Sequence, residues 1–369
     1  MGVPMKPERH TAGLGRTPHE FVVSESLDIE GWDDFVSQHE VGHHVQSTAW
    51  ARFQRLRGWT PVRIFARSGD SLIAVAQILT KRASVFGHVG YLDRAPLVDP
   101  GHLEVLPSMI SAIQALVRER SVRILVSQPS SEDAASVMAD GGFSRTDLII
   151  TLPATVRVDL TSDIDDVLAG MKSKTRYNVR KGLRSGLTVR EGNRSDARLF
   201  HEMLDATAQR QHFESSSIEY VEGLCDALGT MFIAEDGTGP VSAVLLVAFG
   251  SVVVYKRGAW SGRAGKLHPN ELLHWTAMQW AKERGYDKYD FDGIEPEIGC
   301  LVLEGRPIPP DAVRGVTRFK LGFGGDVVML PSALIYIPNR FLRFGHDSVF
   351  RRLSGTKLSK RVVKWIQTR

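Results

Sequence analysis

The fold is decided by the stretch EVLPSMISAIQALVRERSVRILVSQP at Glu104–Pro129, because its pattern returns later in the chain. The segment ELLHWTAMQWAKERGYDKYDFDGIEP at Glu271–Pro296 aligns with it without a gap, at an offset of 167 residues. Both indicate an amphipathic helix, a short turn, a β-rich run and a terminal proline. Upstream, the same offset pairs FARSGDSLIAVAQIL with FIAEDGTGPVSAVLLVAF, each typical of two strands joined by a Gly-containing turn. One supersecondary unit therefore occurs twice.

The duplication predicts two domains, each a mixed α/β sheet flanked by helices. A chain of 369 residues is also too long for one ordinary core, and 43% apolar with 24% charged residues is the composition of a folded protein. We predict a disordered leader over residues 1–19, a first domain over 20–153, a second domain over 154–330 and a basic segment over 331–369.

Several protein classes are excluded by the sequence. The leader lacks the apolar core of a signal peptide. The longest apolar stretch, Val241–Tyr255, is interrupted by Gly250 and Ser251 and predicts a hairpin rather than a membrane span. Cys225 and Cys300 are isolated, which supports neither a disulfide framework nor a zinc site. We therefore expect a cytoplasmic protein without a metal or other cofactor.

Positive charge is concentrated in two places, although the formal net charge is only +4. The stretch MKSKTRYNVRKGLRSGLTVR at Met171–Arg190 holds seven Lys or Arg and no acidic residue, and Pro338–Arg369 holds nine against Asp347 alone. Unpaired like charges on one helix face repel each other, and an external anion would relieve this. The first stretch predicts a phosphate-binding helix, with a solvated helix as the alternative. The tail, whose cations alternate with apolar residues, predicts contact either with an anionic membrane surface or with the first domain.

Five motifs in order resemble the FemABX family of peptidoglycan-bridge aminoacyltransferases, which are built from two GNAT-like domains. They are QSTAWARFQRLRGW (Gln46–Trp59), YLDRAPLVDP (Tyr91–Pro100), MKSKTRYNVRKGLRSGL (Met171–Leu187), PNELLHWTAMQWAKERGYDKYDFDGI (Pro269–Ile294) and FKLGFGGDVV (Phe319–Val328). The resemblance runs from about Gln46 to Pro331. The helical-hairpin insertion of some members is not found in this sequence.

The resemblance implies transfer of an amino acid from aminoacyl-tRNA to an amine of a peptidoglycan precursor, lipid II or its UDP-linked precursor, without metal or ATP. It also implies that the C-terminal segment returns to the first domain. The implied substrate-binding residues are Tyr91, Arg94, Arg210, Tyr220, Tyr255 and Phe319. The implied tRNA-binding residues are Lys172, Lys174, Arg176, Arg180 and Arg184.

Three residues are candidates for catalysis. An aminoacyl ester is already activated, so an aligned amine and a cation near the developing oxyanion suffice. Lys320, next to glycines in FKLGFGG, is the candidate cation, with a solvated lysine as the alternative. Asp292, which shares a strand face with Asp290 in YDFDGI, is a candidate to bind or deprotonate the amine, or else it starts a turn. Asp99 is a candidate for binding the amine of the acceptor, or else it caps a turn before Pro100.

Two positions depart from the family pattern. Members often carry an Arg at the position of Ser216 and a Lys at the position of Gln54, and both are associated with the phosphates of the acceptor. The loss of these charges puts a UDP-linked acceptor in doubt and favours, as an alternative, a tRNA-dependent transferase with a small molecule or peptide acceptor.

Two further classes stay open. A GNAT transferase that uses acyl-CoA would show an R-x-x-G-x-G/A loop, and GRAGKLHPNE at Gly262–Glu271 does not match it. An RNA-binding protein without catalytic activity would need several aromatic residues among the cations, and the basic stretch holds only Tyr177.

Overall fold

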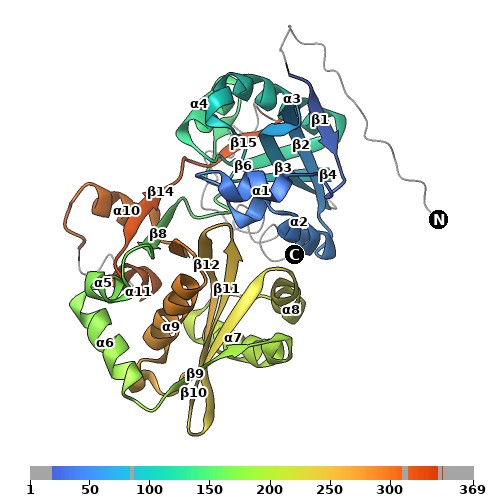
Figure 1. Ribbon diagram of the computed structural model, residues 1–369. Coiled ribbons are helices and arrows are strands. Elements are labelled where there is room, and N and C mark those ends of the chain that lie inside the picture. Colours follow the sequence, from blue (N-terminus) through green and yellow to red (C-terminus); the bar gives the residue numbers. More distant parts are fainter. Residues whose placement is uncertain (1–18, 84–86, 310–314, 340–342, 344–369) are drawn as a thin grey trace. The chain divides into compact units, whose positions relative to one another are not determined.

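The computed structural model describes residues 19–83, 87–309, 315–339 and 343. The chain divides into two compact units (Figure 1): unit 1 extends to Thr151 and resumes at Leu330, and unit 2 comprises Leu152–Met329. The predicted disordered leader, except for His19, and almost all of the predicted basic tail lie outside the described residues.

Unit 1 is built on a mixed sheet with the strand order β1-β2-β3-β4-β6-β15-β7, with β5 paired to β3. The strands are β1 (Phe21–Ser24), β2 (Thr60–Ser68), β3 (Ser71–Ala83), β4 (Gly87–Asp93), β5 (Leu97–Val98), β6 (Val122–Gln128), β7 (Ser144–Arg145) and β15 (Leu334–Tyr336). The helices are α1 (Trp32–Gln38), η1 (His44–Gln46), α2 (Thr48–Leu56), η2 (Pro100–Val105), α3 (Leu106–Glu119) and α4 (Glu132–Asp140).

Unit 2 has the strand order β9-β10-β11-β12-β13-β8-β14. Its strands are β8 (Ala154–Asp159), β9 (Thr188–Gly192), β10 (Gly229–Asp236), β11 (Gly239–Phe249), β12 (Val252–Trp260), β13 (Lys288–Gly293) and β14 (Asp326–Met329). Its helices are α5 (Ile164–Gly170), α6 (Ser173–Leu183), η3 (Arg194–Asp196), α7 (Ala197–Gln211), α8 (Ile218–Ala227), η4 (Gly265–Leu267), α9 (Pro269–Glu283), α10 (Pro296–Leu303) and α11 (Gly315–Gly322).

The seven-strand orders of the two sheets match position for position, with β5 as an addition in unit 1, which confirms the duplicated α/β fold. Both contain a single parallel pair, β4 with β6 and β12 with β13, and every other neighbouring pair along the two strand orders is antiparallel. The predicted offset pairs β2 with β10, β3 with β11 and β6 with β13. The hairpin predicted from Gly250 and Ser251 is the connection of β11 to β12.

The sheet position next to the parallel pair is filled differently in the two units. In unit 2 it is taken by β8, which precedes the rest of that unit in sequence. In unit 1 it is taken by β15, which the chain forms only after it has completed unit 2. Unit 1 therefore depends on a strand that follows unit 2 in sequence, whereas unit 2 is built from one continuous segment.

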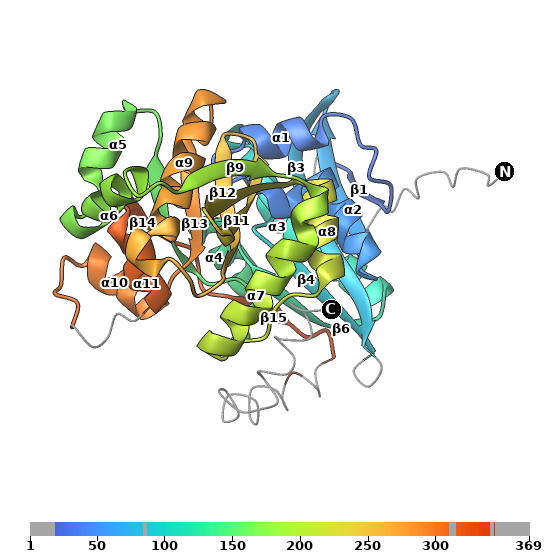
Figure 2. The same cartoon turned by 90° about the horizontal axis from the view of Figure 1, so that it is seen from below.

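Helices cover both faces of the sheet in unit 2. β11 is buried at every position from Val241 to Val247, as expected for a central strand with a layer on each side. Figure 2 shows α7 and α9 on different sides of β11 and β12. The helix α9 begins at Pro269 and packs Leu273, Ala277 and Ala281 into the core, at the spacing of one helix face.

No helix among the described residues is both long enough and apolar enough to cross a bilayer.

Candidate active site

The candidate site of unit 2 lies where β12 and β13 stop pairing. The two strands are paired in parallel from Val252 with Lys288 to Val254 with Asp290, and β12 then continues to Trp260. At this point β12 carries a bulge against β11, since Leu245 is paired with Arg257 and Leu246 with Tyr255. The extra residue of the bulge is Lys256. A bulge bends a strand and redirects side chains, and bulges are common beside active sites.

Lys256 and Asp292 link the two strands beyond the paired region. The Lys256 Nζ lies 2.9 Å from Asp292 Oδ2, and both side chains are largely buried. Asp292 has a φ of 59°, a left-handed conformation that costs a non-glycine residue on the order of 1 kcal/mol. Its backbone N–H donates to Asp290 Oδ1 at 2.7 Å, which fixes this conformation. Such a conformation held by its surroundings is typical of functional sites.

Asp290 serves as an anchor and not as a second reactive carboxylate. Its side chain is buried and accepts hydrogen bonds from Thr155 Oγ1 and from Arg157 Nε, the latter at 2.8 Å, both on β8. The carboxylate of Asp292 instead contacts β12, on the other side of β13. The two aspartates predicted on one strand face are therefore bound by different neighbouring strands.

Lys320 is buried and not solvated. Its side chain extends from α11, the residue is only 6% exposed, and Nζ donates to the carbonyl oxygen of Gly293 at 2.6 Å. Burial lowers the pKa of Lys320 to about 8, although the negative charges of Asp292 and Asp290 favour the ammonium form. The ammonium group therefore lies at the end of β13, next to the Lys256–Asp292 pair, and is still mostly charged at pH 7.

Aromatic side chains surround this lysine. Tyr255 places its ring 5.6 Å from Lys320 Nζ, and burial raises the Tyr255 pKa to about 12, so that its hydroxyl stays protonated. The Tyr255 hydroxyl fills the space beside Gly258, where a Cβ would come within 2.1 Å of it. Phe319, predicted to bind substrate, packs with Phe323 in the same cluster.

His274 belongs to this cluster and was missed by sequence reasoning. Its ring contacts Tyr255 and Phe319, and its Nδ1 lies 2.8 Å from the hydroxyl of Tyr289. Burial and the nearby charge of Lys320 lower the pKa of His274 to about 3, so the imidazole is neutral. The available signal was a histidine within the apolar face of the predicted helix, beside Leu273 and Trp275.

The two positions that lack the family's charges each lie beside an arginine. Ser216 Oγ accepts a hydrogen bond from Arg257 Nε at 3.3 Å. In unit 1, Gln54 Oε1 accepts a hydrogen bond from Arg57 at 3.0 Å. The sequence alone indicated a loss of charge at both positions. It did not show that an arginine from another position lies beside each of them.

Arg257 also contacts a predicted substrate-binding residue. Its guanidinium lies 5.5 Å from the ring centroid of Tyr220, which is buried at the start of α8. Arg210, another predicted substrate-binding residue, donates to Thr207 Oγ1 and to the carbonyl of Trp260 from the exposed end of α7.

Unit 1 holds the remaining predicted substrate residues. Tyr91 is buried, its hydroxyl lies 2.7 Å from Thr151 Oγ1, and burial raises its pKa well above the usual range. Arg94 is 4% exposed with a φ of 54°, and its Nε has no hydrogen-bond partner among the described residues. Asp99 accepts the Gly101 N–H at 2.7 Å and caps η2, which is the turn alternative considered for it.

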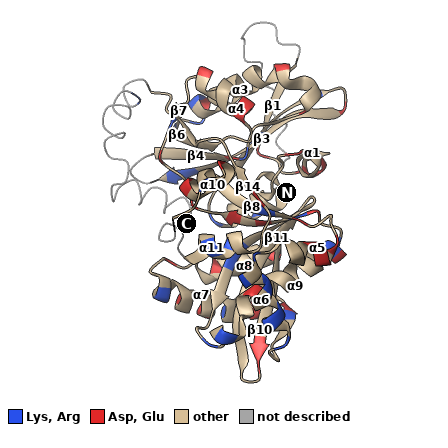
Figure 3. Ribbon diagram, turned by 90° about the vertical axis from the view of Figure 1, so that its left-hand side faces the viewer, with Lys and Arg blue, Asp and Glu red and all other residues tan. Residues whose placement is uncertain are grey.

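The predicted phosphate-binding helix is α6 (Figure 3). Tyr177 is 63% exposed at the centre of a face that also carries exposed cations, and no acidic partner of these cations is found in the described part of the chain. These cations are Lys174, Arg180, Lys181 and Arg184, with Lys172 exposed at the N-cap. Arg176 differs, because it is half-buried and donates to the carbonyls of Ala169 and Met171.

Sequence comparisons match both units. The profile described as the FemAB family matches residues 27–144, and the profile described as the acetyltransferase (GNAT) domain matches residues 173–297. The lipid II:glycine glycyltransferase of Staphylococcus saprophyticus is 22% identical over 352 residues, which cover 73% of this chain and 85% of that protein. The same enzyme of Staphylococcus aureus is 26% identical over 227 residues, and the alignment spans 58% of this chain and about half, 53%, of that protein.

A solved structure shows the same fold. The crystal structure of FemX has a TM-score of 0.76 and 20% sequence identity, with 87% of this chain and 98% of that chain covered. The duplicated GNAT-like architecture and the two profile matches identify the chain as a transferase enzyme that is similar to the FemAB family.

Proposed function

We propose that this enzyme transfers an amino acid from aminoacyl-tRNA to an amine of a peptidoglycan precursor. The named relatives are glycyltransferases that act on lipid II, which supports a precursor of this kind as acceptor. The observation that carries the proposal is the buried ammonium of Lys320 at the end of β13, beside the Lys256–Asp292 pair. A fixed cation in a partly desolvated site is suited to a reaction in which an ester carbonyl becomes an oxyanion.

The reaction needs little besides positioning. The acceptor amine attacks the ester carbonyl, the C–N bond forms, and the bond to the 3′-oxygen of the tRNA breaks. We assign Lys320 to the oxyanion and Asp292 to the acceptor ammonium. The ammonium releases one proton to solvent to become the attacking amine, and the proton that the nitrogen loses after the C–N bond has formed finally resides on the 3′-oxygen. Asp292 pairs with Lys256 through Oδ2, and we assign its carboxylate to accept a hydrogen bond from the acceptor ammonium as well. We assign Tyr255 and Phe319 to contact the donor or the acceptor beside Lys320.

We assign the exposed face of α6 to the tRNA. The cations around Tyr177 have no acidic partner among the described residues, and an RNA backbone would supply the counter-charge. An exposed aromatic ring among cations suits stacking on an unpaired base. Since aminoacyl-tRNA is a cytoplasmic substrate, we propose that the reaction takes place there. The proposed membrane contact of the basic segment falls on residues outside the described part of the chain.

We assign Arg257 to a phosphate of the acceptor. It lies beside Ser216, and no acidic partner of its guanidinium is found among the described residues. Arg257→Ala should raise the KM for the acceptor about tenfold or more, because a charged contact to phosphate is lost. Adding Ser216→Arg should restore part of the affinity, because the new guanidinium starts from a neighbouring position. An unchanged KM in Arg257→Ala would remove this arginine from the acceptor site.

The function is tested by a donor and acceptor screen. Purified protein is incubated with a pool of radiolabelled aminoacyl-tRNAs and either lipid II or its soluble UDP-linked precursor, with labelled acetyl-CoA in a parallel reaction. Label that moves from tRNA to either cell-wall acceptor supports the proposal, and the preferred acceptor shows whether the lipid is required. Label that moves only from acetyl-CoA would overturn the donor assignment. Tight tRNA binding without transfer to either acceptor would favour a small molecule or peptide acceptor.

A further inference from the structure

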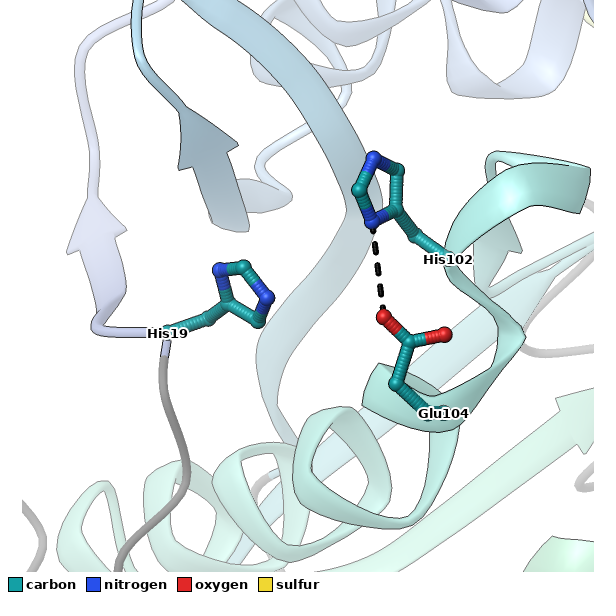
Figure 4. A group of neighbouring side chains, drawn as sticks. All are labelled: His19, His102 and Glu104. Carbon is teal, nitrogen blue, oxygen red and sulfur yellow. Dashed lines mark hydrogen bonds and ion pairs between the residues drawn. The ribbon is translucent and has the colours of Figure 1, made fainter.

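Three side chains of the metal-binding type converge in unit 1, apart from the residues discussed above. His19, His102 and Glu104 each offer one ligand atom, and these three atoms lie within 4.8 Å of one another. Figure 4 shows the two imidazoles and the carboxylate turned toward a common space between the start of β1 and η2. His19 and His102 are far apart in sequence, so residue spacing gave no sign of the cluster.

The distances in the cluster suit a metal better than direct hydrogen bonds. His102 Nδ1 lies 3.4 Å from Glu104 Oε1, which is close to the limit for a hydrogen bond. Two ligands at about 2.0–2.1 Å from a tetrahedral Zn²⁺ are roughly 3.3 Å apart, so this pair already has the required separation. The rings of His19 and His102 are nearly perpendicular, at 81°, with centroids 6.0 Å apart, and one nitrogen of each ring belongs to the set of three ligand atoms.

The backbone holds two of the three ligands in place. Asp99 caps η2 through the Gly101 N–H, and His102 departs from helical geometry within η2, with φ −134° and ψ 31°. His102 and Glu104 thus lie on one anchored segment. Their side chains are 33% and 62% exposed, which leaves water free to complete the coordination.

We propose that His19, His102 and Glu104 bind a Zn²⁺ ion that joins the segment ahead of β1 to η2. Imidazole ligands favour zinc and neighbouring transition metals over Mg²⁺ and Ca²⁺. The strand β1 has four residues and forms the edge of its sheet, where β2 is its one partner among the described strands. A metal that binds His19, ahead of β1, together with His102 and Glu104 of η2 stabilises β1 against fraying, because the ion binds only the folded arrangement.

Binding is tested by titration of Zn²⁺ into chelator-treated, tag-free protein, measured by calorimetry. We expect one ion per chain at the site and at least tenfold weaker binding in His19→Ala and in His102→Ala. Glu104→Gln should weaken binding with little effect on folding, and it keeps the test valid if a histidine variant is unstable. His88→Ala, which removes an exposed histidine of the same unit, is the matched control and should bind as the wild type does.

The structural role is tested by hydrogen exchange of the same proteins with and without Zn²⁺. The ion should slow exchange of the amides of Phe21–Ser24 in the wild type and in His88→Ala, and not in His19→Ala. Equal affinity in all variants would mean an adventitious ion bound elsewhere and would overturn the site. Tight binding without slower exchange in β1 would overturn its role in holding that strand.

Discussion

At the scale of single residues, Lys320 has an unusual environment for a lysine. Its ammonium is buried against Tyr255 and retains one close acceptor, the Gly293 carbonyl. Lys320→Met keeps the length of the side chain and removes the charge, so we expect transfer to fall about 10²- to 10³-fold in kcat, as for loss of one oxyanion donor. Lys288→Met changes an exposed lysine of β13 and should leave kcat unchanged. A wild-type rate in Lys320→Met would exclude the assigned role.

The pH dependence of the reaction follows from the same lysine. Its pKa of about 8 means that the Lys320 side chain is mostly in the ammonium form at pH 7 and loses its charge as the pH rises through 8. If the ammonium stabilises the oxyanion, kcat of the wild type should decline above about pH 8, and the residual rate of Lys320→Met should not show this decline. A wild-type rate that still rises at pH 9 would contradict the prediction.

Asp292 illustrates what sequence reasoning can reach at this scale. The alternation in YDFDGI placed a carboxylate at the end of a strand, and the structure has one there. The left-handed backbone of Asp292 and its contact with Lys256 depend on a bulge in another strand, so they could not be deduced from local pattern. The neutral state of His274 likewise results from packing by residues distant in sequence.

At the scale of elements, β12 is shaped by the fit between Tyr255 and Gly258. Because a Cβ at Gly258 would come within 2.1 Å of the Tyr255 hydroxyl, Gly258→Ala should destabilise the fold by about 1–3 kcal/mol and displace the tyrosine. Tyr255→Phe removes the obstructing oxygen, so the double variant should be more stable than the sum of the single changes predicts. Urea unfolding of all four proteins measures this coupling. Strict additivity would show that the hydroxyl does not occupy this space.

The basic face of α6 makes a prediction about salt. Arg180→Ala combined with Arg184→Ala should weaken tRNA binding and reduce the slope of log K against log salt, by roughly 0.7–0.9 for each lost phosphate contact. Arg306→Ala, three residues after the end of α10, is the control, since this exposed arginine is paired with Glu304 at 3.0 Å. Arg176 is unsuited to the test, because its bonds to Ala169 and Met171 give it a structural role. An unchanged slope would assign α6 to the solvated alternative.

Sequence patterns predicted the repeated hairpin, helix and strand of each unit, and they failed where a segment finds its partner at long range. The offset of 167 residues predicted, in each unit, a hairpin, the helix that follows it and the strand after that helix, because each depends on local periodicity. The patterns could not show which strand fills the position beside β6 or β13, since strand pairing depends on chain topology. They also could not reveal that Arg257 lies beside Ser216, a contact across 41 residues.

At the scale of the whole molecule, β15 makes the sheet of unit 1 dependent on the end of the described chain. A chain that ends at Met329 lacks β15, which pairs with both β6 and β7. We expect faster hydrogen exchange in β6 and β7 and a lower melting temperature for unit 1, with unit 2 unchanged. A chain that ends at Asn339 keeps β15 and is the matched control. Equal protection of β6 in the two truncated chains would show that β15 contributes little.

The position of β15 also has a consequence for synthesis of the protein. On the ribosome, the first 151 residues emerge as an incomplete sheet. The strand β15, which lies between β6 and β7 in the finished sheet, has not yet been made. Unit 2 receives β8 at its beginning, so it can complete its own sheet as soon as Met329 has left the exit tunnel. The unit translated first is therefore the last to finish folding, and the nascent chain exposes an open sheet edge until Tyr336 has emerged.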